Sequence, residues 1–72
     1  MMEIAELNDG FFESIGYDAT ARQLHVRFAN GDYIIYSEVT QMDYVGLMSS
    51  KHMKSFFEDK IIPRFPTRKV NE

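Results

Sequence analysis

The chain holds few residues whose types and spacing suit a reaction or a metal ion. Its two histidines, His25 and His52, lie far apart, and neither has a Cys, His or carboxylate at a ligand spacing such as HExxH. The serines lack a nucleophile-elbow context, and the glycines are scattered rather than gathered in a phosphate-binding loop. Asp18, Asp32 and Asp43 are accounted for by turns and a helix cap, which leaves no carboxylate pair for acid–base catalysis. The sequence therefore predicts a protein without catalytic activity, cofactor or metal site.

Aromatic and basic side chains offer another kind of chemistry, the contact with nucleic acid. Arg27 and Tyr33 are expected on one face of a hairpin, where guanidinium and aromatic groups can stack on unpaired bases. The favoured interpretation is that the two side chains pack on one another across the strands as a cation–π pair. The candidate ligand-binding residues lie on the expected sheet or are basic residues near the second helix. They are Arg27, Tyr33, Tyr36, Lys54, Lys60 and Arg64.

Acidic and basic residues are unevenly divided along the chain. The net charge of −3 argues against independent binding of nucleic acid. Residues 1–50 hold eight acids against two bases, whereas residues 51–72 hold six bases against three acids. We interpret the basic part as a solvated helix face with a soluble tail, and a phosphate-contacting edge is the alternative.

Length and composition indicate one folded domain. The 72 residues leave no room for two domains, and the 44% hydrophobic and 14% aromatic content is typical of a folded chain. A core this small supplies only about 3–5 kcal/mol, so a homo-oligomer or a larger host complex is expected. No apolar run approaches the roughly 20 residues of a membrane span, the acidic start lacks the features of a secretory signal, and the absence of cysteine fits a reducing interior. The sequence predicts a cytoplasmic protein that does not enter a membrane.

A hairpin over residues 24–36 organises the expected fold. Apolar and polar residues alternate in its first strand, and its second strand is aromatic and β-branched. A two-residue Asn-Gly loop would pair Val26 with Ile35, whereas a three-residue loop with Gly31 in a G1 bulge would pair Val26 with Ile34. The two registers place opposite sets of second-strand residues on the core face. We favour the bulged register, which gathers Leu24, Val26, Phe28, Ile34 and Tyr36 on the core face and His25, Arg27, Tyr33 and Ile35 on the other.

One further strand is expected before the hairpin. Residues 11–18 alternate so that Ile15 and Tyr17 share a face, and Gly16 between them indicates a bulge or a close backbone approach. Residues 1–10 are expected to form a short lead-in. The short connections favour an antiparallel meander of three strands.

Two helices are expected after the hairpin. Thr40 is a suitable N-cap and Asp43 occupies the capping-box position, which predicts a helix to about residue 48. Gly46 inside it costs roughly 1 kcal/mol relative to Ala unless a neighbour packs there. A second helix is predicted over residues 51–62, capped by the serine pair at 49–50 and ended by Pro63. Its inward stripe is Met53, Phe57 and Ile61, with Phe56 beside it.

The predicted fold class is α+β, with a three-stranded antiparallel β-meander followed by two short α-helices packed on one face. The expected organisation is a lead-in over residues 1–10, a single domain over residues 11–65 in which Phe65 docks, and a polar tail over residues 66–72.

Several spaced residues together follow a family pattern. In order they are Ile15-Gly16-Tyr17-Asp18, Leu24-x-Val26-x-Phe28, Gly31, Tyr36-x-x-Val39, Phe56-Phe57, Ile61 and Phe65. This order resembles the KTSC domain, which is named for its place at the C-terminus of some lysyl-tRNA synthetases and also occurs as a stand-alone bacterial or phage protein. The resemblance covers residues 11–65, and it implies an association with RNA. The chain departs from the family where Tyr-x-Tyr reads Ile34-Ile35-Tyr36, where Thr40 replaces a proline, and where Ser-x-Gly reads His52-Met53-Lys54.

Two functional hypotheses follow. The first is a small non-enzymatic binding module that contacts RNA or tRNA, as the family resemblance implies. The alternative is a protein-interaction adaptor, phage- or prophage-encoded, whose acidic N-terminal half binds a basic protein partner.

Overall fold

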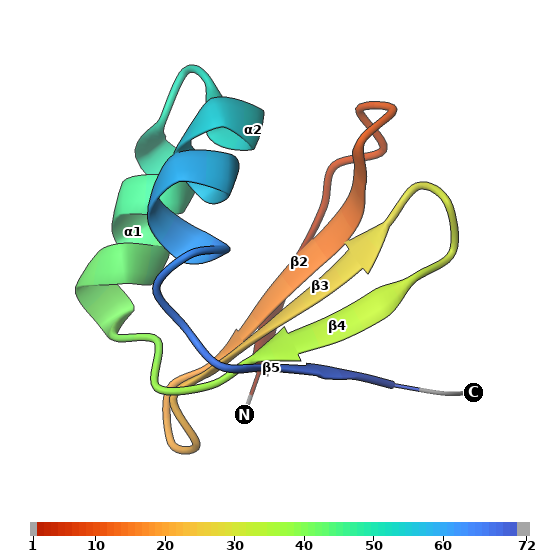
Figure 1. Ribbon diagram of the computed structural model, residues 1–72. Helices are drawn as coiled ribbons and strands as arrows, with labels where there is room; N and C mark the ends of the chain where they lie inside the picture. Colours follow the sequence, from red (N-terminus) through yellow and green to blue (C-terminus); the bar gives the residue numbers. More distant parts are fainter. Residues whose placement is uncertain (1, 71–72) are drawn as a thin grey trace.

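A single antiparallel sheet runs through the computed structural model, which describes residues 2–70 (Figure 1). Its elements are β1 (Met2–Glu6), β2 (Phe12–Asp18), β3 (Gln23–Phe28), β4 (Tyr33–Tyr36), α1 (Gln41–Ser49), α2 (Met53–Phe56), the π-helix η1 (Phe57–Ile61) and β5 (Thr67–Lys69). The strands are hydrogen-bonded in chain order, and the helices lie over one face of the sheet (Figure 1). The α+β class is thus confirmed, but the described sheet has five strands rather than three.

The two additional strands come from the segments expected to be a lead-in and a polar tail. β1 pairs with β2, with Ile4 opposite Gly16, and Asp9 Oδ1 accepts hydrogen bonds from the Phe11 and Phe12 N–H groups at 3.0 and 2.7 Å in the turn between them. β5 pairs with β4, with Arg68 opposite Ile35. All three residues of β5 are exposed, so this strand is held by backbone hydrogen bonds and has no apolar alternation. Pairing, rather than local sequence, makes these segments strands.

The β3–β4 hairpin has the bulged register. Val26 lies opposite Ile34 and Leu24 opposite Tyr36, as predicted. Gly31 has a φ of +97°, and its N–H donates to the Phe28 carbonyl at 3.0 Å. This left-handed glycine is the one that a G1 bulge requires, so the turn chemistry sets which side chains face the core.

Gly16 marks a close approach between β1 and β2. A Cβ atom at this position would lie 3.1 Å from Met2 Sδ and 3.2 Å from Ile4 Cγ1. The Glu3 backbone oxygen would lie 3.3 Å away, so the predicted close approach is confirmed and involves side chains as well as backbone, whereas the irregularity in the ladder lies elsewhere, between Phe12 and Ser14. The absence of a side chain at Gly16 leaves room for the Met2 and Ile4 side chains of β1 to pack over β2.

Helix α1 begins with a reciprocal capping box. The Asp43 N–H donates to Thr40 Oγ1 at 3.2 Å, and the Thr40 N–H donates to Asp43 Oδ2 at 3.3 Å. Gly46 faces Phe56, whose Cζ would lie 3.1 Å from an added Cβ. The neighbour anticipated at Gly46 is thus the Phe56 ring, and the glycine allows the two helices to come together.

The second helix differs from its prediction. It begins at Met53 rather than at residue 51, and its N-cap residue, His52, makes no side-chain capping bond. Ser50 Oγ accepts the His52 N–H at 3.1 Å in the preceding loop instead. From Phe57 the helix widens into η1, where the Ile62 N–H donates to the Phe57 carbonyl at 3.0 Å. This i to i+5 bond is the signature of a π turn, which apolar periodicity does not reveal.

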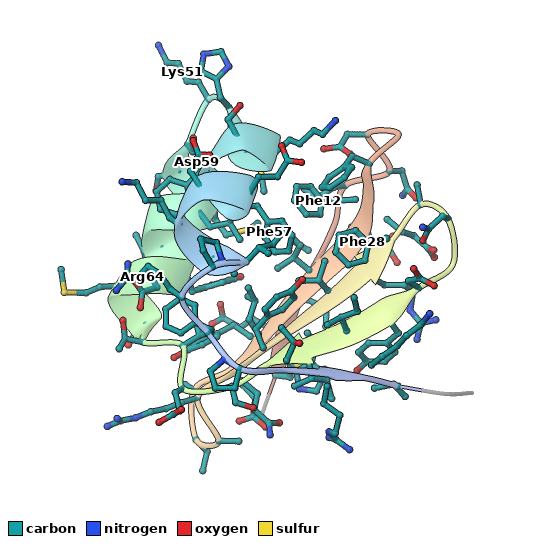
Figure 2. All side chains as sticks on the ribbon, in the orientation of Figure 1. Phe12, Phe28, Lys51, Phe57, Asp59 and Arg64 are labelled. Atoms are coloured by element: carbon teal, nitrogen blue, oxygen red, sulfur yellow. The ribbon has the colours of Figure 1, made fainter. Side chains whose placement is uncertain are left out.

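The core lies between the helices and the sheet. Figure 2 shows the Phe12, Phe28 and Phe57 rings gathered there. Phe57 is fully buried, and its ring centroid lies 5.2 Å from those of both Phe12 and Tyr36. The predicted inward stripe is confirmed at Phe57 and Ile61, which are buried, and Met53 is partly buried against the same core.

Candidate functional site

The face of the sheet opposite the helices is the candidate site. Paired residues in an antiparallel ladder share a face, so the registers place one set of side chains away from the core. In the region that the structure describes, the helices lie on the other side of the sheet (Figure 1). This open face carries Met2, Ile4, Ser14, Gly16, His25, Arg27, Tyr33, Ile35 and Arg68, among others.

A shallow pocket lies near the middle of the open face. It measures about 80 Å³, and its lining residues are Met2, Ile4, Ser14, Gly16, His25, Arg27 and Tyr33. The two β1 residues supply an apolar wall, and β3 and β4 supply the polar and aromatic side. A pocket of this size can take a small group of a larger ligand, not an entire cofactor.

Three side chains on β3 and β4 form a connected group. The Arg27 guanidinium carbon lies 4.7 Å from the centroid of the Tyr33 ring, which confirms the predicted cross-strand cation–π pair. Tyr33 Oη lies 2.6 Å from His25 Nδ1. Burial lowers the pKa of His25, aided by the charge of Arg68 and opposed by that of Asp18. Nδ1 of a neutral His25 ring can accept a hydrogen bond that the Tyr33 hydroxyl donates, and this bond holds the tyrosine ring in place.

The group has the features of a stacking surface. Arg27 and Tyr33 are both half-buried, and the guanidinium lies over the tyrosine ring on the open face of the sheet. Guanidinium and aromatic planes are the surfaces on which proteins stack unpaired bases, and the arginine adds a charge for a phosphate. Among residues 2–70, no three His, Asp or Glu side chains are grouped to hold a metal ion.

Tyr36 does not belong to this surface. It lies in the core under η1 with 3% of its surface exposed, and burial raises its pKa to about 12. Its inclusion among the ligand-contacting residues was wrong for the folded chain, because the register that exposes Tyr33 turns Tyr36 inward.

The basic residues of the C-terminal half also lie away from Arg27 and Tyr33. Lys54, Lys60 and Arg64 are exposed on the helical side of the molecule, where Figure 2 shows Arg64. Lys54 Nζ lies 5.0 Å from the centroid of the Phe11 ring, and Arg64 Nη1 lies 3.8 Å from Asp43 Oδ1. The six candidate residues therefore do not form one site.

His25 is the residue of the group that sequence reasoning missed. It was interpreted as an ordinary surface histidine because no metal-ligand spacing surrounds it. The register contained a usable signal, since His25 is the diagonal cross-strand neighbour of Tyr33 in the bulged hairpin.

Fold and site together define a class of protein: a small α+β domain with helices on one face of an antiparallel sheet and a polar–aromatic group on the other. Within residues 2–70, no helix is long and apolar enough to cross a membrane. The sequence profile of the KTSC domain matches residues 10–65, and the chain belongs to this family. The crystal structure of a KTSC domain protein from Yersinia pestis is similar over 99% of this chain and 100% of that chain, with a TM-score of 0.87 and 28% sequence identity. No curated protein matches the chain.

Proposed function

We propose that this KTSC domain is a non-enzymatic module that binds single-stranded RNA, including unpaired segments of tRNA, on the open face of its sheet. The observation that carries the proposal is the Arg27 guanidinium held 4.7 Å from the Tyr33 ring centroid on that face. Such a pair offers a flat surface for one base and a positive charge for its phosphate.

The charge distribution sets the expected strength of binding. The open face carries Arg27 and Arg68, but the whole chain has a net charge of −3. Few phosphates can be neutralised by two arginines, and the remaining acids repel the RNA backbone. Binding is therefore expected to be weak and to fall only modestly with added salt, because few counterions are released.

The test is a titration of fluorescein-labelled single-stranded RNA and of tRNA at low salt, followed by anisotropy. Arg27→Gln and Tyr33→Leu each remove one half of the stacking surface, and each is expected to weaken binding about tenfold or more. Lys60→Gln is the matched control, because it removes the same charge from an exposed position on the helical side. Circular dichroism is used to check that each variant is folded.

Two results would contradict the RNA function. One is the absence of any anisotropy change for wild type at the highest protein concentration and lowest salt. The other is an equal loss of affinity in the Lys60 and Arg27 variants, which would indicate attraction by net charge without a defined surface.

A protein-interaction adaptor is the second candidate, favoured by a separate observation. The exposed carboxylates of Glu6 and Glu13 border a depression that Asn8, Ser14 and Arg27 also line, so two acids against one base leave a net negative charge for a basic side chain of a partner. A Glu6→Gln, Glu13→Gln variant separates the two functions. The adaptor function is supported if wild type captures a protein in a pull-down and the variant does not. It is rejected if the pull-down returns only nucleic acid and the variant binds that nucleic acid as well as wild type or better.

A further inference from the structure

The two edges of the sheet are built differently. β5 has three exposed residues, follows Pro66 and includes Arg68 and Lys69, so it is short, charged and preceded by a proline. These are the features by which proteins keep an edge from pairing with another chain. β1 has five residues without proline, and Ile4 at its centre is 61% exposed. β1 carries two charged residues of its own, Glu3 and Glu6, but its greater length, its lack of proline and its exposed central isoleucine make it the less protected of the two edges in the part of the chain that the structure describes.

The ladder shows which backbone groups of β1 face outward. The Leu7 N–H donates to the Glu13 carbonyl at 2.9 Å, in the same register that places Ala5 opposite Ile15. Backbone groups alternate along an antiparallel strand, so those of Glu3, Ala5 and Leu7 point toward β2. The N–H and C=O groups of Met2, Ile4 and Glu6 point away from the sheet.

We propose that a second copy of the chain pairs with this edge, β1 against β1 in antiparallel orientation, around a two-fold axis at Ile4. Each Ile4 then lies opposite the other Ile4, and Met2 of one copy lies opposite Glu6 of the other. The pairing is independent of RNA binding.

The sequence of β1 is complementary to itself in this register. Every outward-pointing residue meets an outward-pointing residue, whereas a slip of one residue would misalign the donors and acceptors. Glu3 falls opposite Ala5, and Glu6 opposite Met2, so no two carboxylates are directly opposed. The Ile4 and Met2 side chains of both copies lie on the open face and form one apolar strip across the axis.

The consequence is a continuous sheet of ten strands. Met2 and Ile4 line the shallow pocket of the open face, so the two pockets lie on either side of the axis. A chain of 72 residues has a small core, and burial of further surface between two copies would add to its stability.

The experiment measures mass by sedimentation equilibrium from about 10 µM to about 1 mM chain, a range that covers weak association. The chain has a mass of 8.4 kDa, and wild type is expected to reach twice this value. Ile4→Pro removes an N–H that points outward, so it deletes only bonds to the second copy and leaves the β1–β2 ladder intact. Lys69→Pro is the matched control, because Val70 and Pro66 bond toward β4 and the Lys69 N–H points outward at the other edge.

The proposal requires a dimer in wild type and Lys69→Pro and a monomer in Ile4→Pro. A second variant, Ile4→Lys, places two like charges opposite one another and is also expected to be monomeric. In wild type, the Ile4 amide should exchange its hydrogen more slowly as concentration rises. A wild type that stays monomeric at 1 mM, or a dimer that persists in folded Ile4→Pro and Ile4→Lys, would overturn the pairing.

Discussion

Truncation of Phe57 is expected to remove a large part of the stability of this domain. The ring is fully buried, and four aromatic rings surround it: those of Phe12 and Tyr36 at 5.2 Å, Phe28 at 5.7 Å and Phe11 at 6.4 Å between centroids. Phe57→Ala loses these contacts and leaves a cavity, at a cost of about 3–5 kcal/mol in the free energy of unfolding. A chain of 72 residues has a total stability of about 4–11 kcal/mol, so the loss is a large fraction of the whole.

Urea denaturation followed by circular dichroism measures this loss. Phe57→Leu keeps most of the volume but loses the edge-to-face contacts, and we expect about 1–2 kcal/mol for it. Ile62→Ala is the control, because Ile62 lies one π turn after Phe57, at the end of η1, but is 47% exposed, and its truncation should cost less than about 1 kcal/mol. If Phe57→Ala loses no more stability than Ile62→Ala, the assignment of Phe57 to the centre of the core is refuted.

Three further predictions concern a helix cap, a strand contact and pH. Thr40→Ala breaks the capping box of α1 and should lower the unfolding free energy by about 1 kcal/mol, whereas Thr40→Ser should retain most of it, as urea titration will show. Gly16→Val places a Cβ 3.3 Å from the Glu3 backbone oxygen and should cost about 1–3 kcal/mol, with faster hydrogen exchange in β1. Burial raises the pKa of Tyr36 to about 12, whereas an unfolded tyrosine ionises near pH 10. Its contribution is therefore complete below pH 10 and is lost as the pH rises through about 12; Tyr36→Phe should reduce this alkaline loss, measured by thermal unfolding across that range.

The parts of the fold predicted correctly are those that depend on residues close together in the sequence. The register of the β3–β4 hairpin follows from a turn whose Gly31 must be left-handed, and the start of α1 follows from Thr40 and Asp43. β1 and β5 escaped prediction because their partners, not their own residues, hold them in the sheet. The π turn at Phe57 was also missed, because its apolar residues recur with a spacing that an α-helix shares.

Only the part of the candidate site that lies on the β3–β4 hairpin could be predicted, because the sequence determines the register of that hairpin. Arg27 and Tyr33 were paired correctly because they lie directly opposite in that register. The apolar wall of the pocket was missed, since Met2 and Ile4 come from β1, the strand that local pattern did not reveal. Lys54, Lys60 and Arg64 were grouped with the sheet residues by charge alone, and charge does not indicate which side of the sheet a residue occupies.

The residues that carry the family pattern are mostly those that build the core. Ile15, Tyr17, Leu24, Val26, Tyr36, Val39, Phe57 and Ile61 are all buried at 5% exposure or less. The group formed by His25, Arg27 and Tyr33 lies outside this pattern, on the face of the sheet opposite the helices. Membership of the family therefore accounts for how the chain packs, and the candidate site lies in residues that the pattern leaves open. Replacing Arg27 and Tyr33 together in this chain should leave the fold unchanged and abolish the proposed RNA binding, which circular dichroism and an RNA titration of the double variant would test.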